Sequence, residues 1–204
     1  MRRQRPYKKR LVLGLTGSFG SGKTTVAKYF RTYGARIVDA YRIAHAVLGP
    51  GKPAYKKIVR IFGERILKKN KSIDRKRLAK IVFRNNNLLH KLNCVVHPEV
   101  IKAIKARISA LESGIIVLDA PLLIEAGLNK IVDKLIVVSI DRKEQLARLE
   151  KKLYLGKRDI LERIKAQIPL SDKVRMADFV IDNSLRLEET RKQVIKIRRL
   201  LWKN

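Results

Sequence analysis

Short apolar runs alternate along the chain with segments of helical periodicity. The apolar runs predict buried strands at 11–16, 35–38, 115–118, 134–140 and 179–181. Apolar residues three or four positions apart predict amphipathic helices at 23–33, 143–153, 159–167, 171–176 and 187–202. Strands that alternate with helices form parallel βαβ units, so this pattern predicts an α/β protein whose sheet is covered on both faces.

One long stretch departs from the alternation. Between residues 54 and 113 the pattern is helical and strongly basic, with helices expected at 55–62, 75–83, 88–96 and 99–111 and no convincing strand. We therefore predict a helical insertion at 54–113. The core would then combine 11–53 with 114–204, and a basic tail at 1–10 would precede it.

Composition limits the classes of function. The 204 residues are 46% hydrophobic but only 6% aromatic, so the core must be largely aliphatic. Lys and Arg number 48 against 18 Asp and Glu, a formal net charge of +30, which suits a polyanionic partner such as a nucleotide, a phosphorylated metabolite or nucleic acid. The single cysteine, Cys94, excludes an internal disulfide framework, and no apolar run reaches membrane-spanning length. We expect a soluble cytoplasmic protein with no membrane partner.

The segment Gly17-Ser-Phe-Gly-Ser-Gly-Lys23-Thr24 matches the motif G-x-x-x-x-G-K-[ST] in full. Its glycines let backbone N–H groups surround phosphate oxygens, while Lys23 reaches the β- and γ-phosphates and the Thr24 hydroxyl holds Mg²⁺. The motif follows a predicted strand and opens a predicted helix, which is the context that this chemistry needs. The N-K-x-D motif of GTPases is absent. The sequence therefore favours a small-molecule kinase.

Landmarks along the rest of the chain resemble the dephospho-coenzyme A kinase family from residue 11 to about residue 187. These are Val38-Asp-Ala40, Ile43-Ala44, Gly49-Pro-Gly-Lys-Pro-Ala54, Phe62-Gly63, Ile73-Asp-Arg75, Val82-Phe83, His97-Pro98, Pro121-Leu-Leu-Ile-Glu125, Gln145, Arg148, Gln167, Lys173 and Ala177-Asp-Phe-Val-Ile-Asp-Asn183. The resemblance implies a three-layer P-loop NTPase fold like that of nucleoside-monophosphate kinases, with five parallel strands, an acceptor-binding insertion at 54–113 and a lid near 148–167. It also implies ATP as donor, Mg²⁺ as cofactor and the ribose 3′-hydroxyl of dephospho-coenzyme A as acceptor.

The same resemblance assigns roles to residues. ATP and its metal ion would be bound by Gly17, Gly20, Ser21, Gly22, Lys23, Thr24 and Thr25, with Asn183 near the adenine end. Arg148 would close over the transferred phosphoryl group. Two further roles come from position in the sequence: Asp119, which closes a predicted strand, would help Thr24 to hold Mg²⁺ or take the proton, and Asp39, at the end of another strand, would orient or deprotonate the acceptor. The acceptor side would also include Thr16, His97, Pro98, Leu122 and Glu125.

Two positions depart from the family pattern. Tyr41 stands where a second aspartate, the expected base, is found, and Lys152 stands where a lid arginine is expected. A tyrosine with an ordinary pKa near 10 is a poor base at neutral pH, and a lysine lacks the two-pronged grip of arginine on phosphate. Two alternatives therefore stay open: a kinase for a different nucleotide-like acceptor, and a nucleotide- or RNA-binding protein with weakened or lost catalysis. Nucleic-acid binding is not favoured, and we expect a monomer or a small homo-oligomer.

Overall fold

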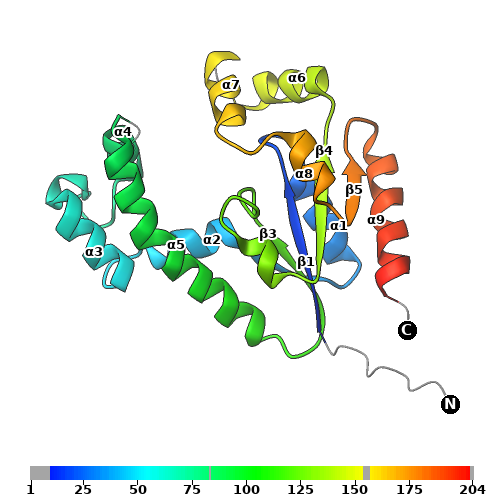
Figure 1. Cartoon of the computed structure of the whole chain (residues 1–204), viewed down its shortest axis with the longest axis horizontal. Coiled ribbons are helices and arrows are strands. Elements are labelled where there is room, and N and C mark those ends of the chain that lie inside the picture. The colour runs from blue at the N-terminus through cyan, green and yellow to red at the C-terminus, as the bar shows by residue number, and fades with distance from the viewer. Residues whose placement is uncertain (1–9, 83, 154–156, 203–204) are drawn as a thin grey trace. The chain divides into compact units, whose positions relative to one another are not determined.

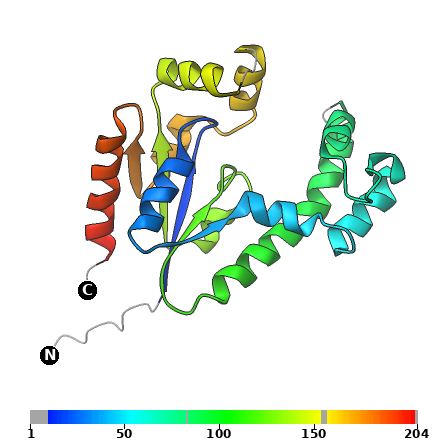
Figure 2. The same cartoon turned by 180° about the vertical axis from the view of Figure 1, so that it is seen from behind.

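The computed structural model describes residues 10–82, 84–153 and 157–202, without the side chains at 151–153 and 157–159. The chain forms two compact units, which are described separately. The first combines Met1–Val38 with Leu111–Asn204, and the second is Asp39–Ala110 (Figures 1 and 2).

The first unit is built on a five-stranded sheet in the order β2-β3-β1-β4-β5. The strands are β1 (Arg10–Gly17), β2 (Arg36–Asp39), β3 (Gly114–Asp119), β4 (Lys134–Ser139) and β5 (Phe179–Asp182). The central strand β1 pairs in parallel with β3 and with β4, and β4 pairs in parallel with β5. The expected five-stranded α/β sheet is therefore confirmed. Arg10, expected in the basic tail, opens the central strand.

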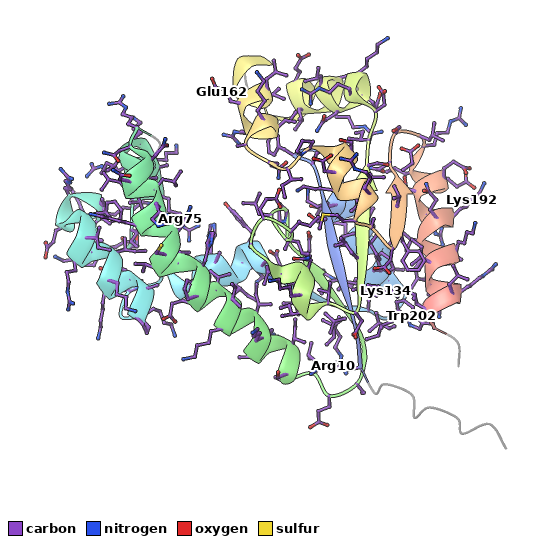
Figure 3. All side chains as sticks on the ribbon, in the orientation of Figure 1. Arg10, Arg75, Lys134, Glu162, Lys192 and Trp202 are labelled. Carbon is purple, nitrogen blue, oxygen red and sulfur yellow. The ribbon has the colours of Figure 1, made fainter. Side chains whose placement is uncertain are left out.

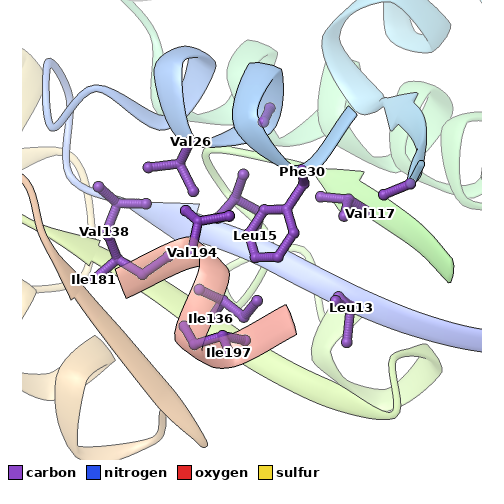
Figure 4. Close-up of a cluster of buried hydrophobic side chains, with 12 residues drawn as sticks. Leu13, Leu15, Val26, Phe30, Val117, Ile136, Val138, Ile181, Val194 and Ile197 are labelled. Atoms are coloured by element: carbon purple, nitrogen blue, oxygen red, sulfur yellow. The ribbon is translucent and has the colours of Figure 1, made fainter. Parts of the chain in front are cut away.

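Helices cover both faces of this sheet. On one face, α1 (Lys23–Thr32) and α9 (Leu187–Leu201) pack against the strands and against each other. Figure 4 shows how Leu13 and Leu15 of β1 meet Phe30 of α1 and Val194 of α9 in an aliphatic core. On the other face, the short helix η2 (Leu128–Ile131) packs against β1, and α8 (Leu170–Arg175) packs against β4. Helices α6 (Arg142–Leu153) and α7 (Lys157–Lys165) connect β4 to α8.

The second unit has a core of its own. It contains α2 (Ala40–Val47), α3 (Pro53–Phe62), the short helix η1 (Glu64–Ile66), α4 (Arg75–Val82) and α5 (Asn86–Ser109). Six aliphatic and aromatic side chains form its buried centre: Ile58, Phe62, Ile66, Ile73, Leu78 and Val82. The unit begins at Asp39, ahead of the stretch 54–113 that the sequence suggested, because α2 packs against α5. That this unit binds the acceptor stays a prediction.

One helix differs from its expected form. The sequence suggested a break at His97-Pro98 between helices at 88–96 and 99–111, but α5 runs without interruption through Pro98. Proline removes the hydrogen bond to the carbonyl four residues earlier, here that of Cys94. Cys94 and Pro98 are both exposed, so water can satisfy that carbonyl. Among the described residues, no helix is both long and apolar enough to cross a bilayer.

Candidate active site

The phosphate loop joins β1 to α1 and is folded so tightly that its glycines cannot be replaced. Gly17 has φ 151° and Gly22 has φ 88°. A Cβ atom on Gly17 would lie 2.4 Å from the carbonyl oxygen of Val138, and one on Gly22 would lie 2.0 Å from Nδ2 of Asn183. The backbone passes so close to β4 and to the residue after β5 that only glycine fits at Gly17 and Gly22.

Lys23 begins α1 with a buried side chain that turns back over the loop. Its Nζ donates to the carbonyl oxygens of Gly17 at 3.2 Å and Ser18 at 3.0 Å. Burial, together with the positive charge of Lys173, lowers the pKa of Lys23 from 10.5 to about 8, while the negative charges of Asp119 and Glu125 act in the opposite direction. The ammonium group is thus held at the loop, where phosphate charge would stabilise its protonated form.

Two glutamines hold the tip of the loop. Gln145 on α6 donates through Nε2 to Ser18 Oγ at 2.9 Å and to the Phe19 carbonyl at 2.6 Å. Gln167, just after α7, accepts from the Phe19 backbone N–H at 2.7 Å. The Arg163 guanidinium lies over the Phe19 ring, 5.4 Å from its centre. Both glutamines are among the residues that resemble the family, but their role could not be predicted, because long-range contacts to a loop leave no periodic signal in the sequence.

Asn183 braces the other side of the loop. Its Nδ2 donates to the Ser21 carbonyl at 2.8 Å, and its Oδ1 accepts from Thr190 Oγ1 on α9 at 2.9 Å. The structure therefore gives Asn183 a place against the loop backbone, while its expected contact with adenine stays a prediction. Ser21 is buried, and its hydroxyl has no hydrogen-bond partner within the described chain.

Arg148 on α6 is anchored near this brace. Its Nε donates to Glu144 at 2.8 Å, and its Nη1 donates to the Asn183 carbonyl at 2.8 Å. Its expected contact with the transferred phosphoryl group stays a prediction. The side chain of Lys152, four residues further along, lies outside the described residues.

The carboxyl ends of β1 and β3 carry a second group of expected site residues. Asp119 ends β3 and is paired in register with Leu15. The buried hydroxyl of Thr16 donates to the Pro121 carbonyl at 3.1 Å. Glu125 forms an ion pair of 2.7 Å with Lys173, whose side chain is fully buried. Leu122, in the same turn, is 49% exposed.

The structure thus brings most of the expected residues together in the first unit. Thr24 and Thr25 lie in the first turn of α1, where the Thr24 side chain is exposed. Sequence reasoning gave no role to Lys173, because a lysine in a polar segment gives no sign that it is buried.

The remaining expected residues belong to the second unit. Asp39 caps α2, accepting from the Arg42 backbone N–H at 3.0 Å. Tyr41 is 66% exposed, with its ring centre 4.3 Å from that of His45. His97 and Pro98 are exposed on α5.

Comparison with known proteins agrees with this architecture. The family model of dephospho-CoA kinase matches residues 11–189. A dephospho-CoA kinase of Carboxydothermus hydrogenoformans is 46% identical over 197 residues, covering 95% of this chain and 96% of the relative. One of Bacillus licheniformis is 47% identical over 187 residues, covering 90% and 93%.

Solved structures give the same result. Protein TT1252 of Thermus thermophilus superposes with a TM-score of 0.86 at 28% identity, covering 97% of this chain and 100% of that protein. Dephospho-CoA kinase from Campylobacter jejuni superposes with a TM-score of 0.71 at 27% identity, covering 93% and 96%. Shikimate kinase from Acinetobacter baumannii, at 13% identity and a TM-score of 0.53, shares the fold alone. With a complete phosphate loop and a family match over most of its length, the chain belongs to the dephospho-CoA kinase family.

Proposed function

We propose that this protein transfers the γ-phosphoryl group of ATP to the ribose 3′-hydroxyl of dephospho-CoA, giving CoA and ADP. The observation that carries the proposal is the complete phosphate loop with its buried Lys23, in a chain that matches the dephospho-CoA kinase family over residues 11–189. The single cysteine suits a reducing compartment, and we place the reaction in the cytoplasm.

The loop and Lys23 bind the phosphates of ATP. Backbone N–H groups of the loop and the N-terminus of α1 face the phosphate oxygens, and the Lys23 ammonium moves from the Gly17 and Ser18 carbonyls to the β- and γ-phosphates. Phosphoryl transfer depends mainly on alignment and charge neutralisation, so a rigid loop with a buried cation supplies much of the catalysis.

Thr24 and Asp119 are the residues that would hold Mg²⁺. A hydroxyl and a carboxylate are oxygen ligands of the kind that Mg²⁺ prefers, and this ion commonly takes one or two protein carboxylates together with substrate phosphates. This proposal is supported by the position of Asp119 at the end of β3, in register with Leu15 of the strand that leads into the loop. When bound, the ion neutralises charge on the β- and γ-phosphates.

Asp39 orients the acceptor hydroxyl and takes its proton, with Asp119 as the second candidate for the proton. A positioned base typically contributes about 10²–10⁴-fold, and it matters least where the transition state is loose. The enzyme therefore tolerates Tyr41 in place of the aspartate found in the family. Arg148 moves over the transferred phosphoryl group when the nucleotide is bound, and closure excludes water that would otherwise hydrolyse ATP.

The first test is ADP release from ATP and Mg²⁺, with and without dephospho-CoA, with the product mass measured. We expect acceptor-dependent ADP and a product heavier by one phosphoryl group. Lys23→Met should abolish this activity, because it removes the cation at the phosphates. Lys192→Met, a change at an exposed lysine on α9, should leave it intact.

Folded protein that binds ATP but gives no acceptor-dependent turnover would contradict the proposal. In that case a panel of nucleotide-like acceptors distinguishes a redirected kinase from a non-catalytic binding protein. Acceptor-dependent turnover would show that Asp39 or Asp119 suffices beside Tyr41.

A further inference from the structure

An ion pair between a fully buried lysine and a partly buried glutamate lies beside the phosphate loop, and neither residue has a role in the proposed phosphoryl transfer. The side chain of Lys173 on α8 is fully buried, and its Nζ lies 2.7 Å from Glu125 Oε1 and donates to the Pro121 carbonyl at 3.2 Å. Lysine is almost never fully buried unless it is paired. A buried ion pair is often no more stabilising than apolar side chains of similar volume, so stability alone is a weak reason for this arrangement.

The first contact of Lys173 leads to the ends of two strands. The Pro121 carbonyl accepts from Lys173 Nζ and also from Thr16 Oγ1 at 3.1 Å. Thr16 directly precedes the phosphate loop, and Pro121 follows Asp119 by two residues. One carbonyl therefore ties the start of the loop to the segment that carries Asp119.

The second contact of Lys173, its ion pair with Glu125, connects it to the tip of the phosphate loop. Glu125 Oε1 accepts from the backbone N–H of Ile168 at 3.1 Å, and the preceding residue, Gln167, holds the Phe19 N–H at 2.7 Å. The other carboxylate oxygen, Oε2, is buried without a hydrogen-bond partner in the described chain, and the Lys173 ammonium lies against the carboxylate at 2.7 Å from Oε1. Lys173 and Glu125 therefore fix the backbone from which Gln167 reaches the loop.

We propose that Lys173 is a positioning residue of the nucleotide site, which acts through Pro121 and Glu125 to hold Asp119 and the loop tip in their relative geometry. The inference deepens the proposed kinase function and rests on it. It differs from the acceptor-side role expected for Glu125, because one arm leads to the segment that carries Asp119 and the other to the loop tip.

The test compares three variants. Lys173→Met removes both contacts and leaves the partly buried Glu125 carboxylate without its cation. Lys173→Met combined with Glu125→Gln also removes that charge but keeps an acceptor for Ile168. Lys192→Met is the matched control, because Lys192 also forms a 2.8 Å ion pair, with Glu189, on the exposed side of α9 (Figure 3).

For each variant we would measure the thermal midpoint, the Kd of a fluorescent ATP analogue with Mg²⁺, and kcat and KM for ATP. If a substitution only reduces the amount of folded protein, the maximal rate falls but KM and Kd for the nucleotide stay unchanged. If it misplaces the phosphate loop or Asp119, KM and Kd for the nucleotide rise. We expect Lys173→Met to lower the midpoint and to reduce kcat/KM for ATP at least about tenfold, since small misplacements of reacting groups are costly. In the double variant we expect the midpoint to recover and the kinetic loss to remain, with Lys192→Met unchanged throughout.

Recovery of both midpoint and kinetics in the double variant would overturn the proposal, as would wild-type kinetics in Lys173→Met. If Lys173→Met does not fold, the double variant carries the test, and a double variant that also fails to fold would assign the pair a structural role instead. The kinase proposal itself is tested separately with the wild-type protein. It fails if that protein binds the ATP analogue but does not phosphorylate dephospho-CoA.

Discussion

At the scale of single residues, the buried Lys23 ammonium makes ATP capture sensitive to pH. Its pKa is lowered to about 8 by burial, so the free enzyme loses this charge as the pH rises through that value. Bound phosphates favour the charged form and keep the proton on Lys23 to higher pH. We therefore expect kcat/KM for ATP, which reports the free enzyme, to fall above about pH 8, while kcat falls only at higher pH.

Steady-state rates at saturating acceptor test this expectation. They should be measured from about pH 7 to about pH 10, because this range spans both the lowered and the ordinary pKa of lysine. The Lys192→Met protein should show the same two profiles as the wild type, because Lys192 is exposed and far in sequence from the loop. A value of kcat/KM for ATP that stays constant across pH 8 would contradict the lowered pKa of Lys23.

At the scale of elements, Asn183 joins the phosphate loop to α9. Its amide accepts from Thr190 on α9 and donates to the Ser21 carbonyl. Asn183→Ala removes both hydrogen bonds and leaves the buried Thr190 hydroxyl without its acceptor, at a cost of about 1–3 kcal/mol in the stability of this region. We expect KM for ATP to rise at least about fivefold, because the loop loses a fixed support on one side.

Gln193→Ala is the matched control for Asn183→Ala. Gln193 also joins α9 to β5, through the backbone N–H and carbonyl of Asp182, but its hydrogen bonds go to Asp182 and Glu189 and not to the phosphate loop. Its removal should lower stability slightly and leave KM for ATP unchanged. Equal effects of the two substitutions on KM, measured in the same ADP-release assay, would show that the brace at Asn183 is not specific to the loop.

The elements also show what a sequence can and cannot predict. The five strands and the phosphate loop were predictable, because apolar runs and a local motif depend on neighbours in the chain. The unbroken course of α5 through Pro98 was not, since it depends on an exposed carbonyl that water can satisfy. Helix α2 was missed although Ala40, Ile43, Ala44 and Val47 follow helical spacing, because the helix has only eight residues. The burial of Lys173 follows from tertiary packing alone.

At the scale of the whole molecule, the net charge of +30 greatly exceeds what ATP and dephospho-CoA require. Basic side chains come from both units, with Arg75 in the second and Lys134 and Lys192 in the first (Figure 3). Aromatic residues are only 6% of the chain, so few rings are available to stack on bases in the manner of single-strand-binding proteins. This distribution favours a generally basic surface over a dedicated nucleic-acid site.

A general positive field and a dedicated site respond differently to salt and to sequence. Binding through phosphates alone weakens steeply as counterions compete, by roughly 10³–10⁵-fold between about 50 and 200 mM salt where six to ten phosphates are contacted. We expect any binding of single-stranded RNA to follow that dependence, to be equal for unrelated sequences, and to leave dephospho-CoA phosphorylation unaffected at physiological salt. Fluorescence anisotropy with two labelled RNAs, together with the ADP assay in excess RNA, measures all three. Salt-resistant binding of one RNA, or its competition with ATP, would instead indicate that this surface carries a specific site.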